Sequence, residues 1–294
     1  MLVNVLTPNV VKRRVYLRDS EFNRAIEAAR NYWLDPARMH DCLWNSAALL
    51  LRPDAIAGRQ STRIFAMLRL HGFIPVAAQE VQVRCSQVEE LWKYQFNVAT
   101  AERRSLLKRL LAISPSVYIM LHDVKWRSSA PATVHLTYLK GTAVVANRKR
   151  WHLRTLAGPP IANLLSYVHV SDEPADVLRE MAVLFDVPTQ ISMFQQLDAG
   201  VDRTTEAMTL IRKLEALAPR DALTGMGQPS FGDEQNLEVQ KLRRGWKDIV
   251  ERARVCRSFV SGETYVGKEA IVPDDKELAL PLDGHLIFQE LGPR

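Results

Sequence analysis

Short apolar runs and amphipathic stretches alternate along the middle of the chain. Three runs are rich in aliphatic residues and end at polar or turn-forming residues, so each predicts a buried strand: Ala47–Asp54, Phe73–Val83 and Ser116–Val124. Between them the periodicity is helical, and we expect helices over Ser61–Gly72 and Arg103–Ala112.

The same alternation continues further along the chain. Residues Ala132–Leu139 have a strand-like pattern, and Asn163–Val170 predicts another strand, which leads into a helix over Asp172–Phe185. This order of elements predicts an α+β fold, in which helices pack on an antiparallel or mixed sheet.

Two segments flank this pattern. On the N-terminal side, Ser20–Leu34 places Phe22, Ile26 and Ala29 on one helical face. Beyond Asp186 we expect a helix over Thr204–Ala218 and then a Gly- and Pro-rich linker over Pro219–Asn236. A basic amphipathic helix over Leu237–Arg257 and a tail of short strand-like pieces follow. The predicted domains are a partly helical N-terminal extension, a central domain and a mainly helical C-terminal extension: 1–45, 46–186 and 187–294.

Charge and cysteine content narrow the class of protein. A formal net charge of +6 suits a phosphate-bearing ligand or nucleic acid and does not choose between them. Cys42, Cys85 and Cys256 are far apart, which argues against a zinc site or a disulfide framework and favours a reducing, cytoplasmic compartment. No apolar run is long enough to span a membrane, and the first basic residues follow the apolar ones, the reverse of a signal peptide.

A single histidine lies where the last predicted strand ends. Strand alternation places His169 on the opposite face from Val168 and Val170. A helix that folds back beside the strand would bring Glu180 near the imidazole, and Ser171 could donate a hydrogen bond to the same ring. Such a carboxylate fixes the tautomer of a histidine nucleophile and leaves one ring nitrogen able to attack. Taken alone, a histidine at a strand end is more often a structural residue.

Arginines supply the second candidate feature. Arg52 follows the first predicted strand, where it could contact a phosphate, although an exposed arginine at a strand end is common. The basic stretch Asn147–Arg150 could bind phosphate or form a solvated loop.

Together these segments resemble the nucleoside diphosphate kinase family. That family's first strand ends in Lys-Pro-Asp, and a helix then leads through Gly-Phe or Gly-Tyr into the second strand; this chain has Arg52-Pro53-Asp54 and Gly72-Phe73. The family's catalytic histidine precedes a small residue, Ser and Asp, with a Glu in the following helix. This chain has His169-Val170-Ser171-Asp172, with Glu180 at the matching distance. The resemblance covers about residues 46–186.

The resemblance implies a ferredoxin-like βαββαβ sandwich and a phosphohistidine mechanism. The histidine would take the γ-phosphoryl group of ATP or another nucleoside triphosphate and pass it to an acceptor. The resemblance assigns His169 as the nucleophile, Glu180 and Ser171 as the residues that support it, and Arg52 and Arg154 to phosphate binding. Because phosphoryl transfer needs neutralised charge, Mg²⁺ carried by the nucleotide is the expected cofactor.

Several positions depart from the family's pattern. Arg52 replaces the lysine of the family's Lys-Pro-Asp motif, and Ser166 replaces an Asn that the family has three residues before the histidine. Its Arg-Pro-Phe-Phe motif, which carries the base-stacking ring, is missing. The candidates for the missing groups are Tyr94 and Phe96 for the ring, and Arg148 or Arg150 for a loop arginine. The base-binding half of the site therefore departs most from the family.

Two functions from different classes follow. The first is a cytoplasmic phosphotransferase that acts through phospho-His169 on a nucleoside diphosphate or another small-molecule acceptor. The alternative is a catalytically inactive, kinase-like module that binds a nucleotide or a protein. Homo-oligomers are common in the family and are a possible assembly here, whereas a membrane is not an expected partner. Nucleic-acid binding would rest on the basic helix alone, whose charged face is more typically solvated, so nucleic acid is not expected either.

Overall fold

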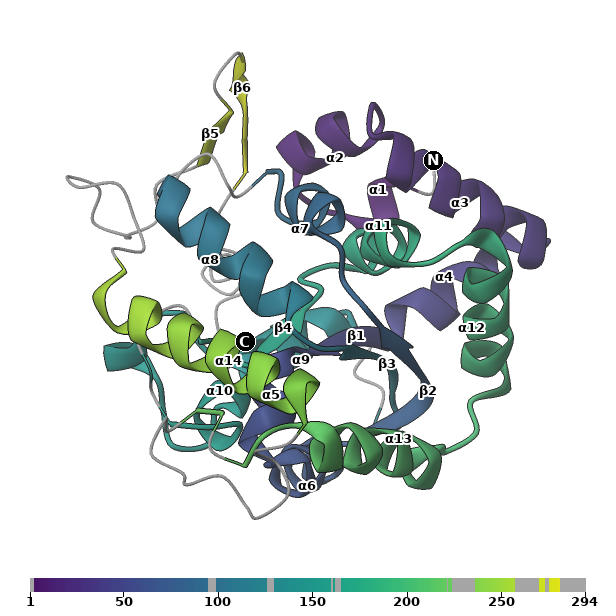
Figure 1. Cartoon of the computed structure of the whole chain (residues 1–294). Helices are drawn as coiled ribbons and strands as arrows, with labels where there is room; N and C mark the ends of the chain where they lie inside the picture. Colours follow the sequence, from purple (N-terminus) through teal and green to yellow (C-terminus); the bar gives the residue numbers. More distant parts are fainter. Residues whose placement is uncertain are drawn as a thin grey trace.

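The computed structural model describes residues 3–94, 99–125, 130–159, 161, 165–220, 222–223, 236–256, 270–272 and 275–280. Its fold is α+β, as the sequence predicts: four antiparallel strands form one sheet, and helices pack around it (Figure 1). The strands lie in the spatial order β2-β3-β1-β4.

The predicted apolar runs form the four strands, which are β1 (Ser46–Leu51), β2 (Phe73–Val81), β3 (Ser116–Asp123) and β4 (Val168–Val170). β1 pairs with β3 on one side and β4 on the other, and every residue of β1 is buried. This burial explains why the run is continuously apolar. β4 is shorter than predicted, because Tyr167 has a φ of 63° that interrupts the extended backbone.

Two connections cross the sheet. β1 and β2 are joined by helices but separated by β3, and β3 and β4 are joined by helices but separated by β1. The first connection holds α5 (Pro53–Gly58) and α6 (Ser61–Leu70), and the second holds α9 (Ala132–Lys140), η2 (Val145–Asn147) and α10 (Leu153–Leu156). Between the neighbours β2 and β3 lie α7 (Cys85–Leu91) and α8 (Ala101–Ala112).

The prediction of a strand at Ala132–Leu139 is wrong. These residues form α9, which follows Pro131 and ends at Gly141, where a φ of 78° stops the helix. β-Branched residues give the segment its strand-like pattern. Leu136 and Leu139 are fully buried, and α9 packs on β1 and β4, so tertiary packing outweighs the local preference.

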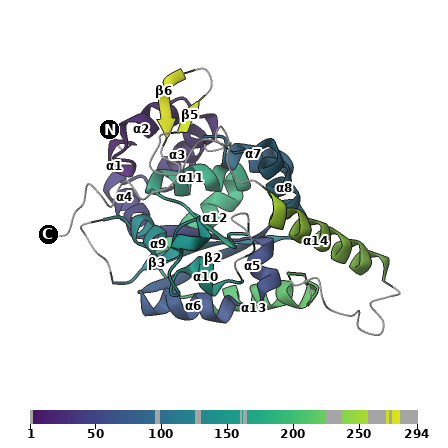
Figure 2. The same cartoon turned by 90° about the vertical axis from the view of Figure 1, so that its left-hand side faces the viewer.

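Helices from both flanks cover the sheet. Those before it are α1 (Val3–Leu6), α2 (Val10–Tyr16), α3 (Ser20–Tyr32) and α4 (Pro36–Trp44), and those after it are α11 (Pro174–Leu184), α12 (Val187–Ala199), α13 (Thr204–Leu217) and α14 (Leu237–Val255). Figures 1 and 2 show α3, α7 and α11 on one side of the sheet, and α6 and α13 on the other. A separate pair of strands, β5 (Ala270–Val272) and β6 (Asp275–Leu280), is antiparallel.

One hydrophobic core joins the three predicted segments. Phe22 of α3, Leu49 of β1 and Trp246 of α14 all belong to it, each at most 1% exposed. This core is continuous across both predicted boundaries, and the division into three domains stays a prediction. Most of the predicted linker lies outside the described residues. In the part of the chain that the structure describes, no helix combines the length and the apolar character needed to cross a membrane.

Gly158 offers a test of the packing around β4. A Cβ at Gly158 would stand 2.6 Å from two ring carbons of the buried Tyr167. We expect Gly158→Ala to lower the free energy of unfolding by about 1–3 kcal/mol, because the rigid ring must move. Urea unfolding measures this change.

The matched control is Gly245→Ala in α14. Its added Cβ meets only the Ile113 side chain, at 3.0 Å, and a helix interior favours alanine by up to about 1 kcal/mol. A Gly158→Ala protein as stable as the Gly245→Ala protein would contradict this description of the packing.

Candidate functional site

His169 lies in the middle of β4. Val168 and Val170 beside it are fully buried, whereas the His169 side chain is 20% exposed. In the sheet it lies opposite Leu50 of β1. Because successive side chains project to opposite faces of a strand, His169 projects away from the side on which the two valines are buried.

Glu180 of α11 holds the imidazole ring. Its Oε1 lies 2.8 Å from Nε2 of His169, and its Oε2 accepts a 2.6 Å hydrogen bond from the hydroxyl of the buried Ser171. Ser171 therefore supports the ring through Glu180 and not directly. A neutral imidazole that donates from Nε2 keeps a lone pair on Nδ1. Within the described residues, Nδ1 has no hydrogen-bond partner.

Electrostatic interactions keep Glu180 ionised. Burial alone raises the pKa of the Glu180 carboxyl, but the charge of His169 and hydrogen bonds from His169 and Ser171 outweigh burial, so the pKa lies below its ordinary value. A carboxyl group with a lowered pKa stabilises the folded protein above its ordinary pKa, and this stabilisation is lost as the pH falls through the folded value. At neutral pH, Glu180 is thus a carboxylate that can orient His169.

Trp92 is a second neighbour of His169, and sequence reasoning missed it. It directly follows α7, and its ring centroid lies 5.1 Å from that of His169, with 71° between the ring planes. The alternating aromatics Trp92, Tyr94 and Phe96 were the available signal, but nothing in the sequence tells which ring faces the histidine.

Arg52 lies at the end of β1 and is 4% exposed. Its guanidinium group binds both carboxylate oxygens of Asp54, at 3.1 and 3.2 Å, and donates a 2.8 Å hydrogen bond to Ser166 Oγ. Asp54 also accepts a hydrogen bond from the backbone N–H of Tyr167. Arg52 therefore ties the end of β1 to the segment that leads into β4, and it could contact a phosphate only by exchanging these partners.

Arg148 and Arg154 bind the backbone of the loop that follows α9. Arg154 donates to the Gly141 carbonyl at 2.8 Å, and Arg148 donates to the carbonyls of Thr142 and Ala143. Burial, together with the charges of Arg154 and Arg52, lowers the pKa of Arg148 to about 10. The structure thus brings three sequence-predicted arginines together, where a bound anion would relieve their mutual repulsion.

Tyr94 has a structural role. Its hydroxyl donates a 2.5 Å hydrogen bond to Asp19, the N-cap residue of α3, and its ring packs under the guanidinium group of Arg179. Those contacts engage both its hydroxyl and its ring, so Tyr94 is poorly placed to stack on a base. Phe96, the other predicted ring, lies outside the described residues.

Acidic side chains near the site are already paired with cations. Asp54 binds Arg52, and Asp172 binds Lys140 at 2.8 Å. In the described ranges, no group of three or more potential ligands could hold a metal ion. Mg²⁺ carried by a nucleotide would take its ligands from phosphates and water, and this cofactor stays a prediction.

Comparison with known proteins assigns no family, because no protein-family model and no curated protein matches the chain. The relation to nucleoside diphosphate kinases therefore rests on the sequence motifs and stays a prediction. The structure does bring His169, Glu180 and Ser171 into contact, as predicted for a supported histidine.

A substitution at Gly141 tests how the loop Gly141–Ala143, whose carbonyls bind Arg148 and Arg154, is held in place. Its φ is 78°, and an added Cβ would overlap the ring of His152. We expect Gly141→Ala to lower the free energy of unfolding by about 1–3 kcal/mol, because alanine avoids this φ. Since the Gly141 carbonyl holds Arg154, the variant should also bind inorganic triphosphate more weakly than the parent in calorimetry. Unchanged triphosphate binding would show that this loop does not contribute to binding of the anion.

Proposed function

We propose that the chain is a phosphotransferase that carries a phosphoryl group on Nδ1 of His169. The observation that carries this proposal is the hydrogen-bonded series Ser171–Glu180–His169, in which a buried carboxylate engages Nε2 and leaves Nδ1 as the nucleophilic atom. A histidine that only fills space needs no such buried carboxylate, and the His169 side chain remains 20% exposed.

In the first step, Nδ1 attacks the γ-phosphorus of a nucleoside triphosphate. The new bond is N–P, the broken bond joins the γ-phosphorus to the bridging oxygen, and the nucleoside diphosphate leaves. Glu180 then balances the positive charge that the ring gains. In the second step an acceptor oxygen attacks the phosphorus, and the N–P bond breaks with its electron pair returning to Nδ1.

The arginine cluster would neutralise the phosphates. Arg148 is partly exposed and donates to backbone carbonyls, so it can turn to an anion at least cost. Arg154 lies beside it, whereas Arg52 would act mainly through its charge, because Asp54 occupies its guanidinium group. Nucleotide-bound Mg²⁺ would offset the remaining negative charge.

The sheet order supports a ferredoxin-like, nucleoside diphosphate kinase-like domain. Two strand–helix–strand crossovers, each leaving one strand between its ends, are what a split βαβ arrangement requires. The acceptor is proposed to be a nucleoside diphosphate or another small molecule.

A second candidate function is a non-catalytic nucleotide- or protein-binding module. It is favoured by Arg52, which is held by Asp54, and by Tyr94, which is held by Asp19, because both predicted ligand contacts are used within the fold.

Phosphorylation of His169 distinguishes the two functions. Incubation with γ-labelled ATP and Mg²⁺ should give acid-labile, base-stable label that is absent from His169→Ala. Glu180→Ala should slow labelling about 10- to 100-fold, because a hydrogen bond to a charged group contributes about 1.5–3 kcal/mol. Nucleotide binding should persist in Glu180→Ala, and nucleoside diphosphates should discharge the label if they are acceptors.

His135→Ala is the matched control. His135 is 18% exposed and also faces a carboxylate, with Nδ1 3.5 Å from Asp123 Oδ2. Its variant should label like the parent. Label that survives in His169→Ala would contradict the His169 mechanism, and a parent that binds ATP without labelling would favour the binding module.

A further inference from the structure

Two helices bring neighbouring side chains to the ring of His169. α11 carries Glu180, which binds Nε2, and the end of α7 carries Trp92, which packs against the ring. The relative placement of α7 and α11 therefore sets the environment of the imidazole.

Arg179 joins these two helices. It precedes Glu180 in α11 and is 1% exposed. Its Nη2 donates to the backbone carbonyl and the side chain of Glu90 in α7, at 2.9 and 2.5 Å, two residues before Trp92. The buried Arg179 is thus adjacent in sequence to Glu180, and it is hydrogen-bonded to a residue two positions before Trp92.

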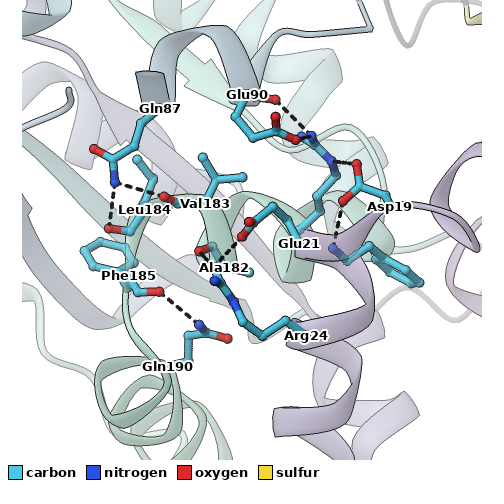
Figure 3. Close-up of polar contacts among 12 residues, drawn as sticks. Asp19, Glu21, Arg24, Gln87, Glu90, Ala182, Val183, Leu184, Phe185 and Gln190 are labelled. Atoms are coloured by element: carbon cyan, nitrogen blue, oxygen red, sulfur yellow. Dashed lines mark hydrogen bonds and ion pairs between the residues drawn. The ribbon is translucent and has the colours of Figure 1, made fainter. Parts of the chain in front are cut away.

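The counter-ion of Arg179 comes from the N-terminal flank. Nε of Arg179 lies 2.8 Å from Oδ2 of Asp19, whose other oxygen caps α3 by accepting from the Phe22 N–H. Asp19, the N-cap residue of α3, and Glu90 of α7 are labelled in Figure 3, and both accept hydrogen bonds from Arg179. Burial raises the pKa of Asp19, but the charge of Arg179 and hydrogen bonds from Arg179, Tyr94 and the Phe22 N–H outweigh it and lower this pKa to about 2, so Asp19 is ionised at neutral pH.

Further contacts fasten the C-terminal end of α11 to the same elements. Gln87 of α7 donates to the carbonyls of Val183 and Leu184, and Arg24 of α3 donates to that of Ala182 (Figure 3). Because these contacts hold α7 and α3 against the C-terminal end of α11 without Arg179, a change at Arg179 should release only the end of α7 that carries Glu90 and Trp92 and leave the helices folded.

We propose that Arg179, with Asp19 as its counter-ion, is a positioning residue for His169. It holds Trp92 and Glu180 in place around the imidazole, which makes the N-terminal flank part of the site. The inference rests on the proposed phosphotransfer for its catalytic meaning. Its geometric part can be tested without turnover.

Trp92 provides a spectroscopic test in the full-length protein. An imidazole in contact with an indole quenches its fluorescence, so His169→Gln should raise the emission; this rise, measured in each background, is the fluorescence step. Trp92→Phe should remove the step, which separates Trp92 from the five other tryptophans.

Arg179→Lys keeps the charge but lacks the planar fork that binds Asp19 and Glu90 together. Arg179→Lys and Asp19→Asn should lose at least half of the fluorescence step and label about tenfold more slowly, because small displacements of catalytic groups are costly. Glu89→Gln is the matched control: it removes an ion pair between α7 and Lys108 of α8 without touching Arg179, and should match the parent.

Circular dichroism checks that each variant is folded. If Arg179→Lys is not folded, Glu90→Gln carries the test, because its side chain is partly exposed and its carbonyl contact remains. A parent without the step, or folded variants with the parent's step and labelling rate, would overturn the inference. A parent that shows the step but never labels would overturn the proposed phosphotransfer and leave the geometric part standing.

Discussion

A buried carboxylate needs a hydrogen-bond donor for each oxygen, and Glu180 finds its donors in His169 and Ser171. The three residues come from β4, the turn after it and α11. Their contacts therefore fix how the helix folds back on the strand. Separating α11 from β4 would leave a charge unpaired inside the protein, which costs several kcal/mol. The packing of α11 and the geometry of the candidate nucleophile are thus one constraint.

The same constraint recurs along α11, and residues far away in the sequence satisfy it. Asp176 accepts hydrogen bonds from Lys12 and Tyr16, and Arg179 binds Asp19, so three N-terminal residues neutralise or satisfy buried groups of this helix. Removing one partner of a buried pair costs about 3–5 kcal/mol. The N-terminal helices are therefore part of the scaffold that holds the site.

Local patterns predicted most of the sheet and the contact between His169 and Glu180, because apolar runs and helical spacing are properties of neighbouring residues. They failed where distant packing decides. α9 has a strand-like sequence but forms a helix on β1 and β4. Trp92 contacts His169, whereas Tyr94 is used to bind Asp19, and only the placement of α7 separates their roles. That Arg52 contacts a phosphate stays a prediction, because its guanidinium group also binds Asp54, two residues away.

The central claim is that Glu180 occupies Nε2 and leaves Nδ1 of His169 to take the phosphoryl group. Uniform ¹⁵N labelling, incubation with ATP and Mg²⁺, and a two-dimensional NMR experiment that correlates phosphorus with the ring nitrogens identify the phosphorylated atom directly. We predict a phosphorus coupling to Nδ1 of His169. A coupling to Nε2, or phosphate found on another residue, would contradict it.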